Sequence, residues 1–235
     1  MRHALIFAAG RGERMRPLTA HTPKPLLCVG GKPLIVWQLE KLAAAGCTHV
    51  VINTSHLAGQ FPATLGDGAR WGLHIEYAYE GPTPLETGGG MLHALPLLGA
   101  GPFIAVSGDI WCDADFAALP TAPVALAHLL LVDNPAHHPL GDFVLDPQGT
   151  LHANGEGKLT FSGIGVFRPE LLQDWAARIG ADPSAPGQPP CFKLVSVLHA
   201  AMARGAVSSS HYQGTWMDVG TPERLARLQA TLSPG

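Results

Sequence analysis

The segment LIFAAGRGERMRPLTAHTPKP, residues 5–25, carries the features that decide how this chain is expected to fold and what it binds. An apolar run at residues 4–9 predicts a strand that leads into the turn GRG at residues 10–12. The two glycines permit backbone angles and close approaches that a side chain would prevent. Backbone N–H groups in such a turn can bind an anion, and Arg14 and Lys24 add positive charge. We therefore expect a polyphosphate site here, with the nucleotide-binding residues Ala9, Gly10 and Gly12.

The remainder of the chain alternates between strand-like and helix-like segments. Short apolar or β-branched runs predict strands, and apolar residues at helical spacing predict helices. The expected strands are residues 49–53, 74–79, 103–107, 124–132 and 212–219, and the expected helices are residues 33–45, 57–65, 83–95, 169–178, 195–204 and 221–231. This alternation predicts an α/β fold: a Rossmann-like, mixed but mainly parallel sheet with helices on both faces. Short strands separated by turns in residues 142–167 predict a small antiparallel subregion laid over that sheet.

Length and composition favour one domain. The 235 residues, 46% of them hydrophobic, are enough for a single core spanning residues 1–235. Residues 180–190, GADPSAPGQPP, form the only linker-like segment and predict a loop. The sequence has no apolar run long enough for a bilayer and no signal-peptide pattern. We expect a cytoplasmic protein that does not enter a membrane, and both a monomer and a small homo-oligomer stay open.

Positive charge is concentrated near the N-terminus. Five of the fifteen Lys and Arg residues lie in the first 24 positions, and none lies between Arg70 and Lys158. A nucleic-acid partner would need a broad basic face, which this distribution does not provide. A single cationic focus suits a small anionic substrate. We therefore expect small phosphorylated ligands and no nucleic acid.

Acidic residues after the strand at residues 103–107 are candidates for binding a metal ion. Asp109 follows this strand directly, at the end where open α/β sheets bind ligands. Mg²⁺ prefers hard oxygen ligands, usually one or two carboxylates with phosphate oxygens and water. Asp113 and Asp115 also form the Asp-x-Asp pattern with which glycosyltransferases hold a metal and a nucleotide. We prefer to interpret Asp113 as the N-cap of a short helix at about residues 114–118.

The opening segment fits neither the dinucleotide-binding fingerprint nor the P-loop. Its longer pattern, GRGERMRPLT at residues 10–19 followed by PKP at residues 23–25, resembles the signature of the sugar-phosphate nucleotidyltransferases. The segment WMDVGT, residues 216–221, is similar to the Trp-x-Asp-x-Gly-Thr motif of the same family. The resemblance covers essentially the whole chain. It implies an enzyme that transfers a nucleotidyl group from a nucleoside triphosphate to a sugar 1-phosphate.

The same resemblance implies roles for individual residues. Arg14 and Lys24 would be catalytic and would stabilise charge on the transferred phosphate. Asp109 and Asp218 would together hold Mg²⁺. The domain would consist of a nucleotide-binding half at about residues 1–110 and a sugar-binding half at about residues 111–235.

Several shorter motifs resemble the group of N-acetylmuramate α-1-phosphate uridylyltransferases in particular. They are PLETGGG at residues 84–90, VDNPAHH at residues 132–138, GDF at residues 141–143 and LTFSG at residues 159–163, together with a short C-terminus. This resemblance implies that UTP and N-acetylmuramic acid α-1-phosphate are the substrates. The expected products are the UDP-sugar and pyrophosphate, formed during peptidoglycan recycling.

The residues that select the base and the sugar are predicted with less detail. Glu80, Thr87 and Gly88 are candidates for contacting the base, although a carboxylate such as Glu80 suits guanine as well as uracil. The sugar-side candidates are Asp142, Asn154, Ser162, Gly163 and Lys193. The lactyl carboxylate of N-acetylmuramate needs a partner, for which the candidates are Lys158, Arg168, Lys193, Arg204 or a helix N-terminus. The long segment at residues 180–190 would lie near the sugar and could alter the choice of acceptor.

Two other functions stay open. A mannose 1-phosphate guanylyltransferase would look similar, but such enzymes typically carry Leu-Gly-Thr-Ala-Gly where this chain has LETGG at residues 85–89. A non-catalytic sugar-nucleotide-binding regulator could use the same fold. The joint presence of Arg14, Lys24, Asp109 and Asp218 argues against that second alternative.

Overall fold

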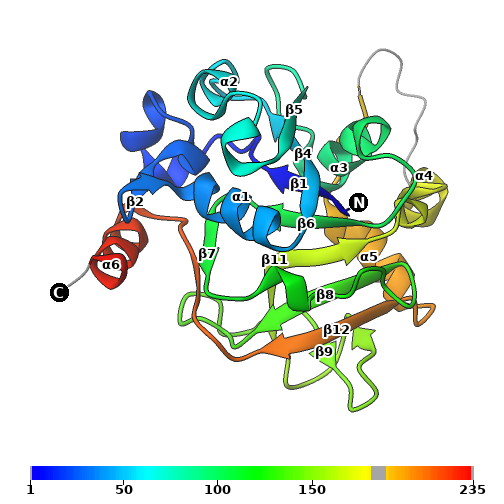
Figure 1. Ribbon diagram of the computed structural model, residues 1–235. Helices are drawn as coiled ribbons and strands as arrows, with labels where there is room; N and C mark the ends of the chain where they lie inside the picture. Colours follow the sequence, from blue (N-terminus) through cyan, green and yellow to red (C-terminus); the bar gives the residue numbers. More distant parts are fainter. Residues whose placement is uncertain (1, 181–188, 234–235) are drawn as a thin grey trace.

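The computed structural model describes residues 2–180 and 189–233, and its centre is a seven-stranded sheet (Figure 1). The strand order is β12-β8-β11-β6-β1-β4-β5. These strands are β1 (Arg2–Phe7), β4 (Cys47–Thr54), β5 (His74–Tyr79), β6 (Phe103–Ser107), β8 (Ala127–Val132), β11 (Thr160–Phe167) and β12 (Val207–Tyr212). β11 runs antiparallel to β6 and β8, whereas the other neighbouring strands are parallel. The prediction of a mixed, mainly parallel sheet is confirmed.

Helices cover both faces of this sheet, as predicted. They are α1 (Leu34–Ala44), α2 (Gln60–Leu65), α3 (Glu86–Leu98), α4 (Trp175–Ile179) and α5 (Leu194–Met202). The last helix, α6 (Pro222–Leu232), packs instead against residues 28–29 and 216–218, beside the sheet. Successive side chains of a strand point to opposite faces. β1 accordingly places Ile6 in one core cluster with α1 and α2, and Leu5 in another with α3 and α5. Burial on both faces explains why residues 4–7 of β1 are continuously apolar rather than alternating.

Shorter elements complete the fold. β2 (Cys28–Val29) pairs with β3 (Lys32–Pro33), β7 (Ile110–Cys112) with β13 (Trp216–Asp218), and β9 (Val144–Leu145) with β10 (Leu151–His152). The 3₁₀ helices span Glu13–Met15, Leu18–Ala20, Lys24–Leu26, Ala69–Trp71, Phe116–Ala118 and Pro169–Leu172. Within residues 2–180 and 189–233, no helix has the length and apolar character needed to cross a membrane.

The prediction of a single strand at residues 212–219 is wrong. The structure has two strands there, β12 and β13, which belong to different sheets. β12 is the outermost strand beside β8, and its sequence VSSSHY lacks the apolar pattern by which buried strands are recognised. Val207 and Ser209 are buried, whereas Ser208 and Ser210 lie 3.0 and 3.1 Å from the two ring nitrogens of His128.

Three other expectations are corrected, and a fourth falls outside the described residues. Residues 160–167 form β11 within the main sheet, so only the β9–β10 hairpin stands apart from it. The helix expected at residues 169–178 is a 3₁₀ turn followed by α4. The N-cap of the 3₁₀ helix at residues 116–118 is Asp115, whose carboxylate accepts from Ala117 N, while Asp113 accepts from the Tyr212 hydroxyl. Residues 181–188 of the predicted loop lie outside the described residues.

Candidate active site

Two adjoining cavities lie at the carboxyl ends of β1 and β6, at the sheet edge where open α/β sheets bind ligands. The smaller has a volume of about 400 Å³ and is lined by residues 7–12, among others. The larger has a volume of about 580 Å³ and lies toward β11 and α5. The residues that line both cavities are Phe7, Ser107, Asp109, Glu86 and Thr87. Ligands in the two cavities would therefore meet beside Asp109.

The predicted phosphate-binding loop lines the smaller cavity and is anchored at both ends. At its start, the backbone N–H of Ala8 donates to Oδ1 of Asn53 at 2.6 Å. At Gly12, φ is 63°, and a Cβ there would lie 2.8 Å from Cγ2 of Thr19. The Thr19 hydroxyl donates to the Gly12 carbonyl at 2.8 Å. Gly12 is therefore required both for its backbone conformation and for this close approach.

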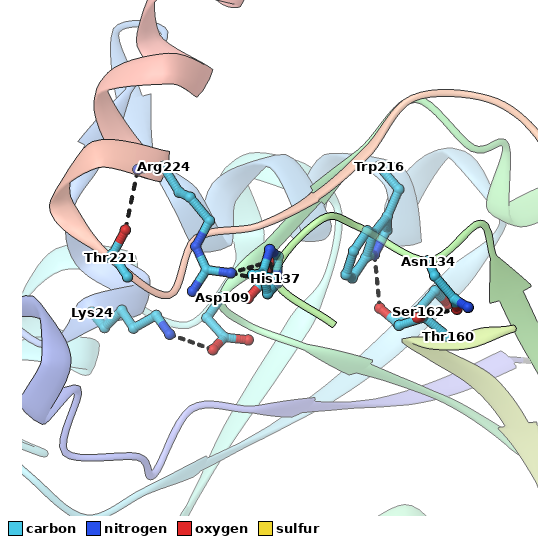
Figure 2. A network of polar contacts seen from close by, with 10 residues as sticks. Lys24, Asp109, Asn134, His137, Thr160, Ser162, Trp216, Thr221 and Arg224 are labelled. Carbon is cyan, nitrogen blue, oxygen red and sulfur yellow. Dashed lines mark hydrogen bonds and ion pairs between the residues drawn. The ribbon is translucent and has the colours of Figure 1, made fainter. Parts of the chain in front are cut away.

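Lys24 and Asp109 form an ion pair where the two cavities meet (Figure 2). Lys24 Nζ lies 2.5 Å from Oδ2 of Asp109, and only 9% of Lys24 is exposed. Pro23 precedes the short 3₁₀ turn that carries this lysine and Pro25 lies within it, so φ is fixed on both sides of Lys24. The Pro-Lys-Pro motif thus holds a partly buried positive charge at the wall of the smaller cavity.

Asp218 reaches the same region through the β7–β13 ribbon. It pairs with Ile110, the residue after Asp109, and the N–H of Val219 donates to the Asp109 carbonyl at 2.8 Å. Both predicted metal-binding aspartates consequently line the larger cavity although they are far apart in the sequence. Two carboxylates at one cavity wall supply the hard oxygen donors that Mg²⁺ prefers.

Arg224 and His137, which lie side by side in Figure 2, both contact Asp218, and the sequence did not predict their role. Arg224 Nη1 lies 2.8 Å and His137 Nε2 lies 3.0 Å from the same oxygen of Asp218. Thr221 is the N-cap of α6, and its hydroxyl accepts from the N–H of Arg224 at 3.4 Å. The capping signal in Thr-Pro-Glu-Arg was visible in the sequence. The contacts of the Arg224 side chain could not be predicted from the sequence, because only tertiary folding brings Asp218 and His137 to it.

The segment predicted to read the base is engaged largely in internal hydrogen bonds. Glu80 is only 6% exposed, and its two carboxylate oxygens accept from Nδ2 of Asn53 at 2.5 Å and from the N–H of Leu85 at 2.7 Å. Burial raises the pKa of Glu80, although both hydrogen bonds favour its charged form. The Gly88 N–H donates to the Phe192 carbonyl at 2.8 Å. Glu80 still lines the smaller cavity, whereas the Gly88 N–H is already used.

Close packing explains the three consecutive glycines in the first turns of α3. A Cβ at Gly88 would overlap the Phe192 ring, and a Cβ at Gly89 would overlap the Pro190 carbonyl. At Gly90, a Cβ would overlap Oε1 of Glu80. The glycines therefore allow α3 to approach the segment before α5 on one side and the buried Glu80 network on the other. Thr87 joins this contact, because its hydroxyl accepts from the N–H of Leu194 at 3.0 Å.

Four of the five predicted sugar-side residues line the larger cavity. They are Asp142, Ser162, Gly163 and Lys193. Asn154 does not line either cavity, so the structure does not bring it to the other four. Asp142 is positioned by His138, at 3.0 Å, and by the N–H of Phe161, at 2.8 Å. The Ser162 hydroxyl donates to the Leu130 carbonyl, and its own carbonyl accepts from Trp216 Nε1 at 2.9 Å (Figure 2).

A model of the nucleotidyl transferase family matches residues 3–139. The chain belongs to this family. The matched residues include the phosphate-binding loop, Lys24 and Asp109, whereas Lys193 and Asp218 follow them. The resemblance to the sugar-phosphate nucleotidyltransferases is therefore confirmed, and so is the expectation of an enzyme.

Similar proteins extend the family assignment over the whole chain. The N-acetylmuramate α-1-phosphate uridylyltransferase of Neisseria meningitidis is 47% identical over 234 residues, which are 97% of this chain and 96% of that protein. The protein of the same name from Caulobacter vibrioides is 33% identical over 98% of this chain and 96% of its own. A putative glucose-1-phosphate thymidylyltransferase from Bacillus anthracis has a similar structure, with a TM-score of 0.82 at 22% identity, over 99% of this chain and 95% of the other. At that identity the structural match shows the nucleotidyltransferase fold alone.

Proposed function

We propose that this protein transfers UMP from UTP to N-acetylmuramic acid α-1-phosphate and releases pyrophosphate. The observation that carries the proposal is the similarity to the Neisseria meningitidis uridylyltransferase, which covers nearly all of both chains. Two cavities that meet beside Asp109 suit a reaction between two phosphorylated ligands. The corresponding cellular role is the reuse of N-acetylmuramate from peptidoglycan in the cytoplasm.

In this proposal the nucleotide occupies the smaller cavity and the sugar 1-phosphate the larger one. Ala9, Gly10 and Gly12 would bind the triphosphate through the loop that Asn53 and Thr19 anchor. Arg14, which is exposed and lines the larger cavity, would approach the phosphates from that cavity, and Lys24 would approach them from the smaller one. The two cations would thus act on the phosphates where they react.

The chemical step is a single displacement. An oxygen of the sugar phosphate attacks the α-phosphorus of UTP, and the bond from this phosphorus to the bridging oxygen of pyrophosphate breaks. A phosphate monoester has a second pKa of about 6, so the attacking oxygen is largely ionised at neutral pH and needs no general base. Arg14 and Lys24 would stabilise the charge that develops on the transferred and departing phosphates.

Asp109 and Asp218 would hold Mg²⁺, which when bound neutralises phosphate charge and orients phosphate oxygens. The donor set fits this ion, because both carboxylates come from strand ends at one cavity wall. In the structure Lys24 balances the charge of Asp109, and Arg224 balances that of Asp218. We infer that these ion pairs also position the two acidic side chains, in addition to the direct role of Lys24 on the phosphates.

Among the candidate partners for the lactyl carboxylate, the lining of the cavities favours Lys193. It lines the larger cavity, and Lys158, Arg168 and Arg204 do not line either one. The Arg168 guanidinium is bonded to the carbonyls of Pro123 and Ala125 instead. Asp142, Ser162 and Gly163 would form the opposite side of the sugar site.

The decisive experiment measures pyrophosphate release with Mg²⁺ for UTP, GTP and dTTP against several sugar 1-phosphates. The sugars should include those of N-acetylmuramic acid, N-acetylglucosamine, mannose and glucose. We expect the highest kcat/KM for UTP with N-acetylmuramic acid α-1-phosphate. A preference for GTP with mannose 1-phosphate would replace the proposal by the guanylyltransferase alternative. Tight binding of UDP-sugars without turnover of any pair would indicate a regulator.

A further inference from the structure

Glu86 has a backbone conformation that is unusual for a residue with a side chain. Its φ is 61°, in the left-handed region that glycine adopts far more readily. In the part of the chain that the structure describes, two other non-glycine residues share this conformation, Leu57 with φ 52° and Asp174 with φ 53°. Neither of these lines the two cavities described above, whereas Glu86 lines both.

The backbone on each side of Glu86 is fixed by hydrogen bonds. The N–H of Leu85 donates to the buried Glu80 carboxylate at 2.7 Å, and the Leu85 carbonyl accepts from the N–H of Phe192 at 3.2 Å. On the other side, the Thr87 hydroxyl accepts from the N–H of Leu194. These contacts hold the turn whichever residue occupies position 86, and glycine would fit it without strain. The side chain of Glu86 therefore needs an explanation other than the turn.

The place of Glu86 limits what its carboxylate can contact. It is exposed within the cavities, and a carboxylate accepts hydrogen bonds but repels phosphate groups. The adjacent segment, to which Leu85 and Thr87 are bonded, contributes Lys193, Leu194 and Val195 to the larger cavity and not to the smaller one. Glu86 thus lies on the side of the larger cavity that α5 and the residue before it line, where this cavity adjoins the smaller one.

We propose that Glu86 is a specificity-determining residue that accepts hydrogen bonds from hydroxyl or acetamido N–H groups of the acceptor sugar. This inference rests on the proposed function and adds a residue that selects the sugar. Lys193, on the same side of the larger cavity, would bind a negatively charged substituent of the sugar, while Glu86 would accept hydrogen bonds from its uncharged hydroxyl or N–H groups. The strained backbone is then retained because glycine at this position would lack the carboxylate.

Three substitutions at this position separate the backbone from the side chain. Glu86→Gly removes both the strain and the carboxylate, Glu86→Ala removes only the carboxylate, and Glu86→Gln keeps one acceptor oxygen. Asp174→Gly is the matched control, because Asp174 has the same backbone strain, makes no side-chain capping hydrogen bond and lies outside both cavities. For each variant, Tm and the KM values for UTP and for the sugar 1-phosphate are measured in the full chain.

We expect Tm to rise in Glu86→Gly and Asp174→Gly but not in Glu86→Ala. The KM for the sugar 1-phosphate should rise about tenfold in both Glu86→Gly and Glu86→Ala, less in Glu86→Gln, and not in Asp174→Gly. An unchanged sugar KM in Glu86→Gly, or a rise confined to the KM for UTP, would overturn the inference. If the wild type prefers a different nucleotide and sugar, the proposed function fails, and the same variants then test Glu86 with that preferred pair.

Discussion

Asn53 should be among the residues on which the nucleotide cavity depends most. It is only 2% exposed, and its side-chain amide connects two segments: Oδ1 accepts from Ala8 N at 2.6 Å, and Nδ2 donates to Glu80 at 2.5 Å. Asn53→Ala leaves the Ala8 N–H and one Glu80 oxygen without these partners. Each buried group that loses its partner costs about 1–3 kcal/mol, so we expect the free energy of unfolding to fall by about 2–6 kcal/mol.

Urea denaturation followed by tryptophan fluorescence measures this change, with the m-value as the check that unfolding stays cooperative. The KM for UTP should also rise about tenfold, equivalent to about 1.4 kcal/mol, because Ala8 begins the phosphate-binding loop. Ser209→Ala is the control: Ser209 is buried on β12, and its hydroxyl has no hydrogen-bond partner among the described residues. This control should change stability by less than about 0.5 kcal/mol. The reasoning is refuted if Asn53→Ala matches the control in stability and keeps the wild-type KM for UTP.

Three further predictions concern the packing of Gly90, the role of Asp109 and the protonation of His49. Gly90→Ala should destabilise the fold by about 1–3 kcal/mol in urea denaturation despite the helix propensity of alanine, because its Cβ would overlap Glu80 and lie 2.6 Å from Nδ2 of Asn53; a more stable variant would contradict this packing. Asp109→Asn should lower kcat about a hundredfold or more with an unchanged circular dichroism spectrum, whereas near-normal turnover would exclude Asp109 as a metal ligand. Burial lowers the pKa of His49 from 6.5, so the native state binds fewer protons there than the unfolded state, and stability should fall as the pH drops from about 7 to about 5. His49→Val should flatten that profile, and an equally steep profile in the variant would assign the acid sensitivity elsewhere.

The sequence predicted those elements whose signal is local. β5 and β6 occupy the predicted residues, because each is a short run of strand-forming residues bounded by turn residues. β12 was missed because an edge strand with three consecutive serines has no apolar pattern, and its strand character comes from pairing with β8. The antiparallel β11 was placed outside the main sheet for a related reason. Which strands pair with each other depends on the whole sheet, so it cannot be predicted from the sequence of one strand alone.

The candidate site divides in the same way. The sequence predicted the phosphate-binding loop, Lys24 and Asp109. A glycine turn, a proline-flanked lysine and a strand-end aspartate can each be recognised from a few neighbouring residues. The sequence did not predict Asn53, Arg224 or His137, whose partners come from distant segments. For Gly88, glycine is needed to avoid the Phe192 ring, and its N–H, a predicted base contact, donates to the Phe192 carbonyl in this structure.

By itself, then, the sequence determined that the chain forms an α/β sheet with a polyphosphate loop, because backbone propensity and glycine conformations are local properties. Only the tertiary structure decided which carboxylates are available for chemistry. Glu80 is buried and hydrogen-bonded to Asn53 and Leu85, Asp109 and Asp218 are brought to one wall by the β7–β13 ribbon, and Glu86 is held in a strained turn between two cavities. The physical reason is that burial, charge pairing and strain at these residues depend on atoms that fold in from elsewhere in the chain.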